Sequence, residues 1–327
     1  MAAKIIDGEA VAKSMNEETA SAVAELKAKG RTPHLVAVQV GENPASKIYT
    51  NAQAKNCSAV GVEYELLNLP ESISLDQLLI KIAELNASRV ATGLILQMPL
   101  PPHLDARQVQ VGISPAKDVE GMHPENMGRL FYGGGIVSPC TPTAAVELLR
   151  RTLGEKEIAG KECVVVGHSE IVGKPIAAIM LQSLNASPTV TVCHVATKDL
   201  AFHTRRAEIL FVATGVSQAR WLGYQRRKKA GENVQPPKLT PLITGDMLKE
   251  GAVVIDVAIN RIPAELDAKG EPVKDEKGKP RMKTVGDVDY QAALGKVAAI
   301  TPVPGGVGPV TVAMLLKNTV ACAKAMT

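Results

Sequence analysis

The stretch ECVVVGHSEIVGKP, residues 162–175, decides the fold of this chain. An apolar run ends at Gly167, a turn continues to Gly173, and a helical pattern begins at Pro175. Glycines allow the backbone to approach a pyrophosphate closely, and the N-terminus of the next helix offers N–H groups and partial positive charge. The stretch therefore predicts a dinucleotide site. On this motif alone an ordinary tight turn remains an alternative, because the spacing departs from GxGxxG and no acidic residue ends the next strand.

Apolar runs of strand length alternate with helix-length segments on both sides of this motif. Such alternation predicts βαβ units with parallel sheets, and hence an α/β fold in which the later runs form a Rossmann-like sheet. Strands are expected at residues 34–40, 93–100, 162–168, 189–195, 208–215 and 252–259. Helices are expected up to about Val60 and at residues 143–152, 175–184 and 310–326.

Length and composition indicate a soluble globular protein with two domains. The chain has 327 residues, of which 46% are apolar and only 3% aromatic, so Ala, Val, Leu and Ile must build its core. A domain boundary is expected at residues 139–142, in SPCTPT. Residues 216–241 and 265–283 are rich in charges and contain Gly and Pro, which predicts two solvated surface insertions.

Several classes of function are disfavoured by composition. The net charge of +4 comes without a basic stripe interleaved with aromatics, which argues against nucleic-acid binding. No apolar run approaches the roughly 20 residues that cross a bilayer, and the N-terminus lacks a signal-peptide pattern, so a cytoplasmic protein is expected. The five cysteines are scattered without CxxC spacing, which predicts neither disulfides nor a metal site.

Further motifs along the chain occur in the order that is typical of one enzyme family. They are GENPASKIY (41–49), GLILQMPLP (93–101), KDVEGMHPENMGRL (117–130), PCTP (139–142), VVVGHSEIVGKP (164–175), VIDVAIN (254–260), GDVD (286–289) and TPVPGGVGPVT (301–311). With these segments the chain resembles the bifunctional methylenetetrahydrofolate dehydrogenase/methenyltetrahydrofolate cyclohydrolase family over nearly its whole length.

The resemblance implies two α/β domains that flank a cleft, in a homodimer. Residues 1–142 plus 290–327 would form the folate-binding catalytic domain, and residues 143–289 the Rossmann-like NAD(P)-binding domain. The dehydrogenase moves a hydride from the methylene carbon of 5,10-methylenetetrahydrofolate to nicotinamide. The cyclohydrolase then hydrates the resulting 5,10-methenyl cation to 10-formyltetrahydrofolate. Hydride transfer depends on positioning, whereas hydration needs a group that takes or passes a proton.

One family position is changed in a way that separates these two reactions. The family places a tyrosine and, four residues later, a lysine on one face of a helix. Tyr49 is retained, but position 53 holds Gln53, and Lys47 and Lys55 face elsewhere by helical phase. A desolvated lysine can exchange protons near neutrality, whereas a glutamine amide only donates and accepts hydrogen bonds. We therefore expect dehydrogenase activity with weak or absent cyclohydrolase activity, and we expect Gln97 to lie near Tyr49 and Gln53.

The resemblance also assigns residues that bind the two substrates. Glu120 stands where the family usually has an aspartate that clasps the pterin amide edge; Asp118 is the less favoured candidate. The folate side comprises Ser46, Pro99, Pro101, Glu120, Gly305, Gly306 and Pro309. The cofactor side comprises Gly167, His168, Ser169, Gly173, Pro175, Val195, Thr214, Gly215 and Ile259.

The choice between NAD and NADP stays open. Members that use NADP commonly have Arg and Ser where this chain has His168 and Val195. An arginine grips a 2′-phosphate bidentately, whereas histidine is mostly neutral at pH 7 and valine offers no hydrogen bond, which argues against a strong NADP preference. The Arg and Lys residues of 216–241 offer a partner for that phosphate or for the polyglutamate tail of a folate, although a solvated basic face is the favoured explanation.

Two other functions are compatible with the sequence. The first is a fully bifunctional enzyme in which another group or a water chain replaces the lysine. The second is a catalytically weak, folate-binding regulatory protein, which the substitutions at positions 53, 120, 168 and 195 favour. A dehydrogenase for another small substrate conflicts with the folate-side matches around Tyr49 and Gln97.

Overall fold

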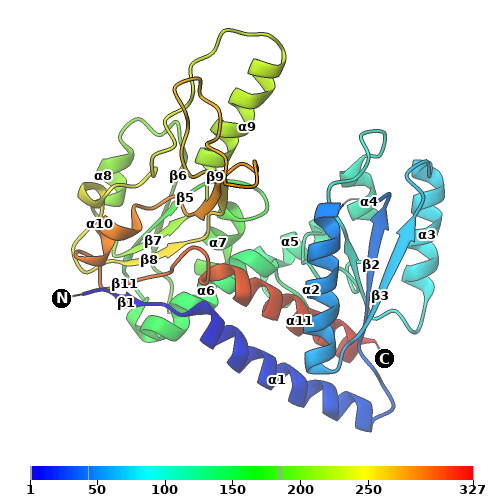
Figure 1. Cartoon of the computed structure of the whole chain (residues 1–327). Coiled ribbons are helices and arrows are strands. Elements are labelled where there is room, and N and C mark those ends of the chain that lie inside the picture. The colour runs from blue at the N-terminus through cyan, green and yellow to red at the C-terminus, as the bar shows by residue number, and fades with distance from the viewer. Residues whose placement is uncertain (1, 43, 184–185, 327) are drawn as a thin grey trace. The chain divides into compact units, whose positions relative to one another are not determined.

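The structure is a computed structural model that describes residues 2–42, 44–183 and 186–326, with the backbone alone described for residues 44–49. The chain divides into two compact units (Figure 1). The six-stranded unit comprises Met1–Glu9 and Ala144–Pro309, and the three-stranded unit comprises Ala10–Thr143 and Val310–Thr327. Helices α1 (Gly8–Ala28), α6 (Cys140–Leu153) and α11 (Val307–Ala325) each contain residues of both units.

The six-stranded unit is built on a parallel sheet with the order β1-β11-β8-β7-β5-β6. The four strands predicted for this part of the chain are all present and parallel, each with four or five residues. The strands are β1 (Lys4–Ile5), β5 (Glu162–Val166), β6 (Thr189–Cys193), β7 (Ile209–Val212), β8 (Val253–Asp256) and β11 (Ala299–Ile300). The helices are α7 (Gly173–Met180), α8 (Leu200–Thr204) and α10 (Tyr290–Leu294), with short 3-10 turns η1 (Glu155–Glu157) and η2 (Gly245–Met247).

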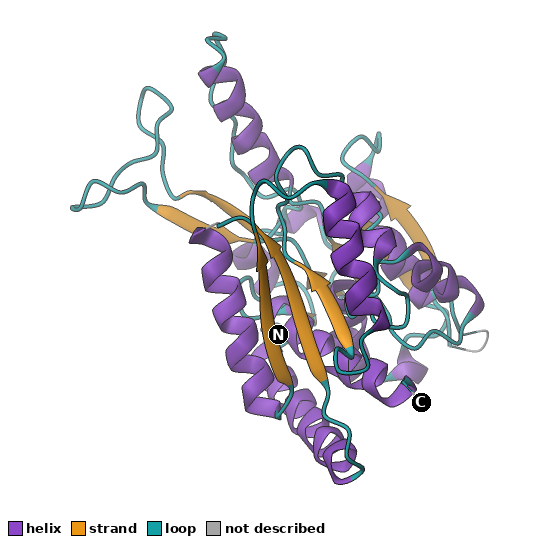
Figure 2. Cartoon of the chain, turned by 90° about the vertical axis from the view of Figure 1, so that its right-hand side faces the viewer, coloured by secondary structure: helices purple, strands orange, loops and turns teal. Residues whose placement is uncertain are grey.

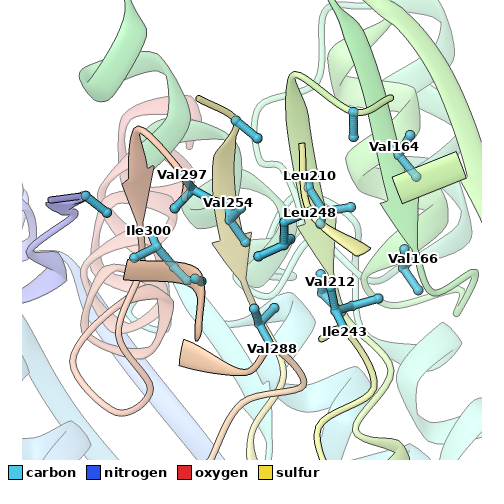
Figure 3. Packing of buried hydrophobic residues seen from close by; sticks show 14 of the residues in the cluster. Val164, Val166, Leu210, Val212, Ile243, Leu248, Val254, Val288, Val297 and Ile300 are labelled. Atoms are coloured by element: carbon cyan, nitrogen blue, oxygen red, sulfur yellow. The ribbon is translucent and has the colours of Figure 1, made fainter. Parts of the chain in front are cut away.

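The core of this unit is made of valine, leucine and isoleucine from neighbouring strands. Val164 and Val166 of β5, Leu210 and Val212 of β7, and Val254 of β8 are fully buried in one cluster (Figure 3). Strands buried on both faces need near-continuous apolar sequence, which is why these runs were recognisable. Each buried side chain of this size contributes roughly 1.5–3 kcal/mol relative to full exposure.

The division between the units differs from the sequence-based boundary at residue 290. β11 pairs with β8, and α10 precedes β11 in the chain, so residues 290–309 belong to the six-stranded unit. The last residues of the chain belong to the three-stranded unit from Val310 onward. The first residues of the chain also join this unit, because β1 pairs with β11. Strands of two residues are too short to leave a periodic pattern, so neither pairing could be read from the sequence.

The three-stranded unit has the parallel strand order β3-β2-β4 (Figure 2). Val36 and Val38 of β2 pack with Leu94 of β4 against Leu78 and Ile82 of α3. The strands are β2 (His34–Val40), β3 (Glu63–Leu69) and β4 (Gly93–Leu96). The helices are α2 (Pro44–Val60), α3 (Leu75–Ala87), α4 (Ala106–Gly112) and α5 (Pro124–Tyr132).

β3 was not expected from the sequence. It lies at the edge of the sheet, where Glu63, Glu65 and Asn68 are exposed. An edge strand of this kind lacks the continuous apolar run by which the buried strands were recognised.

The prediction that residues 216–241 form a solvated insertion is wrong for residues 216–229 and holds for the largely exposed residues 230–241. Residues 216–229 form helix α9 (Val216–Lys229), which projects from the six-stranded unit beside the antiparallel pair β9 (Asn260–Pro263) and β10 (Met282–Val285) (Figure 1). Trp221 and Tyr224 of α9 are buried in a small core with Ile262. The basic residues at the end of α9 obscured this apolar face in the sequence. The second predicted insertion, residues 265–283, is a largely exposed loop as far as residue 281, and its last two residues, Met282 and Lys283, begin β10.

Among the described residues, no helix is both long and apolar enough to cross a membrane.

Candidate active site

Two side chains of the three-stranded unit donate hydrogen bonds to the amide of Gln53. Gln97 follows β4 and is only 8% exposed, and its Nε2 donates a hydrogen bond to Gln53 Oε1 at 2.9 Å. The hydroxyl of Tyr64, on β3, donates to the same oxygen at 3.3 Å. Gln53 and Gln97 are therefore brought together as expected, and Tyr64 is a third member that the sequence did not reveal.

None of these three side chains is suited to proton exchange near neutrality. Amides neither gain nor lose protons in this range. Burial, followed by the neighbouring Cys57, raises the pKa of Tyr64 to about 12. Burial likewise raises the pKa of Cys57 to about 12. Lys55, farther along α2, is exposed on the surface.

Tyr49 and Ser46 lie in the first turns of α2, whose backbone is helical there. Their side chains are outside the described residues. The expected positions of the two side chains toward the folate therefore remain predictions.

Glu120 and Asp118 behave differently although they are two residues apart. Asp118 is buried, and its Oδ2 accepts hydrogen bonds from the backbone N of His123 at 2.7 Å and from Asn126 Nδ2 at 3.0 Å. Glu120 is half-buried, and burial followed by the charge of Asp118 raises the pKa of its carboxyl to about 7. Asp118 is thus engaged in holding the start of α5, which leaves Glu120 as the carboxyl group suited to a ligand.

The two prolines of the predicted folate floor lie two and four residues after Gln97. Pro99 is exposed and Pro101 is half-buried.

On the six-stranded unit, the turn after β5 has the close backbone approach that a phosphate site requires. Gly167 has φ +124°, and a Cβ built on it would lie 2.4 Å from the carbonyl oxygen of Ala213. A Cβ on Gly173 would lie 1.9 Å from the carbonyl oxygen of Gly167. Ser169 Oγ accepts the backbone N–H of Val172 at 3.1 Å, and Pro175 is buried in the first turn of α7. Only glycine fits at both ends of this turn, and the residues present fit a dinucleotide pyrophosphate at the start of α7.

The next strand end brings two histidines together. His168 and His194 are both exposed, with ring centroids 4.8 Å apart, and Val195 beside them is 55% exposed. The backbone N of Ala196 donates to His194 Nδ1 at 3.2 Å, which leaves Nε2 of that ring to carry the proton. In a Rossmann-like sheet the end of the second strand is where the adenosine ribose is bound.

Thr214 and Gly215 form the turn that ends β7, and Ile259 follows β8. Thr214 uses its hydroxyl to donate to Asp287 Oδ2, and Gly215 adopts φ +60° immediately before α9. Ile259 is 59% exposed and lines a cavity of about 90 Å³.

The glycine loop before α11 lines that same cavity. Gly305 has φ +99°, and a Cβ on Gly306 would lie 2.5 Å from the carbonyl oxygen of Pro302. Pro309 is also part of the lining. The structure thus places these predicted folate-side residues beside Ile259, a predicted cofactor-side residue.

Three buried residues at this edge were not predicted as site residues. Asp256 ends β8, Asn260 begins β9, and Asp287 follows β10; all three are at most 3% exposed. A buried carboxylate is costly unless it is hydrogen-bonded. The available signal was the polar residues Asp256 and Asn260 within the largely apolar segment VIDVAIN, and Asp287 within the GDVD segment.

Comparison with known proteins agrees with this geometry. Residues 6–120 match the catalytic-domain model of the tetrahydrofolate dehydrogenase/cyclohydrolase family, and residues 139–220 and 239–327 match its NAD(P)-binding domain model. The chain is 43% identical over 319 residues to the bifunctional protein FolD of Chloroherpeton thalassium, covering 96% of each chain.

Solved structures show the same relationship. The bifunctional FolD enzyme of Campylobacter jejuni is 38% identical with a TM-score of 0.80, covering 99% of each chain. The Trypanosoma brucei methylenetetrahydrofolate dehydrogenase-cyclohydrolase, complexed with NADP and an inhibitor, is 34% identical with a TM-score of 0.79, covering 99% of this chain and 98% of that one. The chain therefore belongs to the tetrahydrofolate dehydrogenase/cyclohydrolase family.

Proposed function

We propose that this protein is a 5,10-methylenetetrahydrofolate dehydrogenase in which hydration of the methenyl product is weak or absent. The observation that carries the proposal is the amide of Gln53, whose oxygen accepts hydrogen bonds from Gln97 and Tyr64. This closed arrangement occupies the position where the family has a lysine. It supports binding and orientation of a substrate, but it contains no group that changes protonation near pH 7.

The residues of each unit have separate tasks in the proposed reaction. On the six-stranded unit, Gly167 and Gly173 admit the pyrophosphate of a nicotinamide dinucleotide at the start of α7. A nicotinamide dinucleotide held there would supply the acceptor for a hydride from the methylene carbon of the folate. On the three-stranded unit, Gln97 orients Gln53, and both amides are available to hydrogen-bond the folate. Holding the two reactants in register is the main demand of hydride transfer.

Glu120 is proposed to accept the N–H groups of the pterin edge. Its half-buried carboxyl group, with a pKa of about 7, ionises more readily when N–H donors face it. Its additional methylene, relative to the family aspartate, moves the carboxyl group farther from the backbone. Substrate binding is therefore expected to strengthen as the pH rises through about 7.

Hydration of the methenyl cation is the test of the proposal. General acid–base groups typically contribute about 10²–10⁴-fold to rate, so their absence should leave hydrolysis close to the buffer rate. The enzyme is given 5,10-methenyltetrahydrofolate, and its loss is compared with buffer alone. Gln53→Lys should raise this rate, whereas Lys55→Gln, a change at an exposed position of the same helix, should leave it unaltered.

A fully bifunctional enzyme is the second candidate, favoured by the name of the Chloroherpeton relative, bifunctional protein FolD. Rapid enzyme-dependent hydrolysis by the unaltered protein would establish it and refute the loss of cyclohydrolase activity. Absence of NAD(P)-dependent oxidation of methylenetetrahydrofolate would instead favour a folate-binding regulatory protein.

The remaining features of the proposal follow from family membership. The cofactor is NAD or NADP, and the folate-binding role is given to the three-stranded unit, Ala10–Thr143 and Val310–Thr327. A cytoplasmic homodimer acting on free or polyglutamylated folates is proposed. Initial rates with NAD and NADP at equal concentration determine the preferred cofactor.

A further inference from the structure

A buried carboxylate holds the turn that ends β7. Asp287 is 0% exposed, and three donors converge on its Oδ2 atom. They are the backbone N of Thr214 at 2.8 Å, the hydroxyl of Thr214 at 2.5 Å and the backbone N of Gly215 at 3.0 Å. Charge-assisted hydrogen bonds of this kind are about twice as strong as neutral ones. The Thr214–Gly215 turn is therefore fixed by a residue 73 positions away.

The same carboxylate supports the start of α9 through Asn260. Asp287 Oδ1 accepts from Asn260 Nδ2 at 3.0 Å, and Asn260 Oδ1 accepts the backbone N–H of Gln218 at 2.9 Å. Gly215, the residue before α9, has no side chain with which to cap it. The side chain of Asn260 thus caps a first-turn N–H group of α9, and Asp287 holds Asn260 in place to do so.

The turn held by Asp287 contacts the glycine turn after β5. The backbone N of Ala213 donates to the carbonyl oxygen of Val166 at 2.8 Å, and the carbonyl oxygen of Ala213 lies only 2.4 Å from where a Cβ of Gly167 would be. Both turns stand at the carboxyl ends of adjacent parallel strands, the edge at which dinucleotides bind. A shift of Thr214 and Gly215 would therefore also displace Gly167.

We infer that Asp287 is a positioning residue for the dinucleotide cofactor. It fixes the Thr214–Gly215 turn, and through Ala213 the glycine turn, in the arrangement that receives the cofactor. Asp287 is buried and does not itself reach a ligand. This inference rests on the proposed function, because it presumes that the edge binds NAD or NADP.

The test compares Asp287→Ala and Asp287→Asn with the unaltered protein. Dissociation constants for NADH and NADPH are measured by fluorescence, below the unfolding temperature of every variant. Asp287→Ala should weaken binding about 10-fold or more, the usual effect of removing charged hydrogen bonds. Asp287→Asn should weaken binding less, because its amide oxygen can still accept hydrogen bonds from Thr214 and Gly215. It should not bind as tightly as the unaltered protein does, because its NH₂ group would face the NH₂ group of Asn260.

A matched control and two independent measurements separate positioning from general loss of structure. Asp289→Asn changes the same motif at a residue that caps α10, where asparagine is an equally good cap, and should leave cofactor affinity unchanged. Hydrogen exchange should accelerate at Thr214 and Gly215 in Asp287→Asn. In steady-state kinetics the KM for the cofactor should rise, while the KM for the folate stays within about twofold of the unaltered protein.

Two results would overturn the inference. One is a folded Asp287 variant that binds cofactor as tightly as the unaltered protein; if Asp287→Ala does not fold, Asp287→Asn decides. The other is unchanged exchange at Thr214 and Gly215. Neither result bears on the proposed function, which is tested separately by oxidation of methylenetetrahydrofolate by the unaltered protein. Failure of the unaltered protein to bind NADH or NADPH would refute that function together with the inference.

Discussion

Glu120 shows how one residue can couple stability to substrate binding. Its pKa is raised to about 7, mainly by burial, so the folded protein holds this proton more tightly than the unfolded chain. The resulting stabilisation is present at low pH and is lost as the pH rises from the ordinary glutamate range through about 7. Glu120→Gln removes the ionisable group. The free energy of unfolding of the variant minus that of the unaltered protein should therefore be larger at pH 8 than at pH 5, by at most about 3 kcal/mol. Urea unfolding at both pH values measures this, with the exposed Glu25→Gln as control; an equal difference at both pH values would contradict it.

His168 determines a second prediction at the residue scale. Replacing it by arginine places a permanent guanidinium beside His194, at the strand end where the ribose of the cofactor is expected. His168→Arg should raise the ratio of kcat/KM for NADP over NAD by about 10- to 100-fold, the effect of a charged hydrogen bond to phosphate. Glu170→Gln changes the net charge in the same direction on the same turn and should shift the ratio much less. Equal shifts in both variants would show that charge alone, and not phosphate contact, sets the preference.

The role of a single residue could be predicted from the sequence where the residue lies within a family motif. The contact between Gln53 and Gln97 was predictable because the family resemblance places both positions at the folate site. Tyr64 could not be added, because its contact with Gln53 depends on β3, an edge strand without a clear apolar pattern. Asp287 could not be assigned for a related reason: its partners Thr214 and Gly215 are far away in the chain.

At the scale of elements, burial on both faces made a strand predictable. β2 was predicted with its observed bounds, since its sequence HLVAVQV is buried almost throughout. The error at α9 has the opposite cause. Its C-terminal half is basic and exposed, and only Trp221 and Tyr224 mark the side that packs against β9. Residues 221–238 also fall outside the matched family domain, so family resemblance gave no guidance for this segment.

Trp221 should carry most of the stability of this additional element. It is 3% exposed and packs with Tyr224 and Ile262 in a core separate from that of the sheet. Trp221→Ala should cost about 3–5 kcal/mol locally, as for other buried aromatic residues. Limited proteolysis should then cut within residues 221–238 while the sheet core persists. Leu222→Ala, at a neighbour 46% exposed, should change stability by less than about 0.5 kcal/mol. Equal resistance of both variants to protease would show that α9 does not depend on this core.

For the whole molecule, the arrangement of residues predicts how its two potential reactions are related. Hydride transfer depends on positioning, for which the glycine turns and the hydrogen bond that joins Gln97 to Gln53 are in place. Hydration needs a proton-exchanging group beside Gln53, and the side chains described as contacting its amide oxygen are an amide and a phenol whose pKa is about 12. The first reaction should therefore proceed without the second.

This separation can be measured as a ratio of products. During turnover with methylenetetrahydrofolate, each NADH or NADPH formed should be matched by one 5,10-methenyltetrahydrofolate, which then disappears only at the rate of the buffer reaction. Gln53→Lys should lower the amount of methenyl product at a given amount of reduced cofactor and raise 10-formyltetrahydrofolate correspondingly. If the unaltered protein instead forms 10-formyltetrahydrofolate as fast as reduced cofactor, then a group other than residue 53 transfers the proton. The ratio is taken at early times, before the buffer reaction removes much methenyl product, so that different amounts of active enzyme in the variants do not alter it.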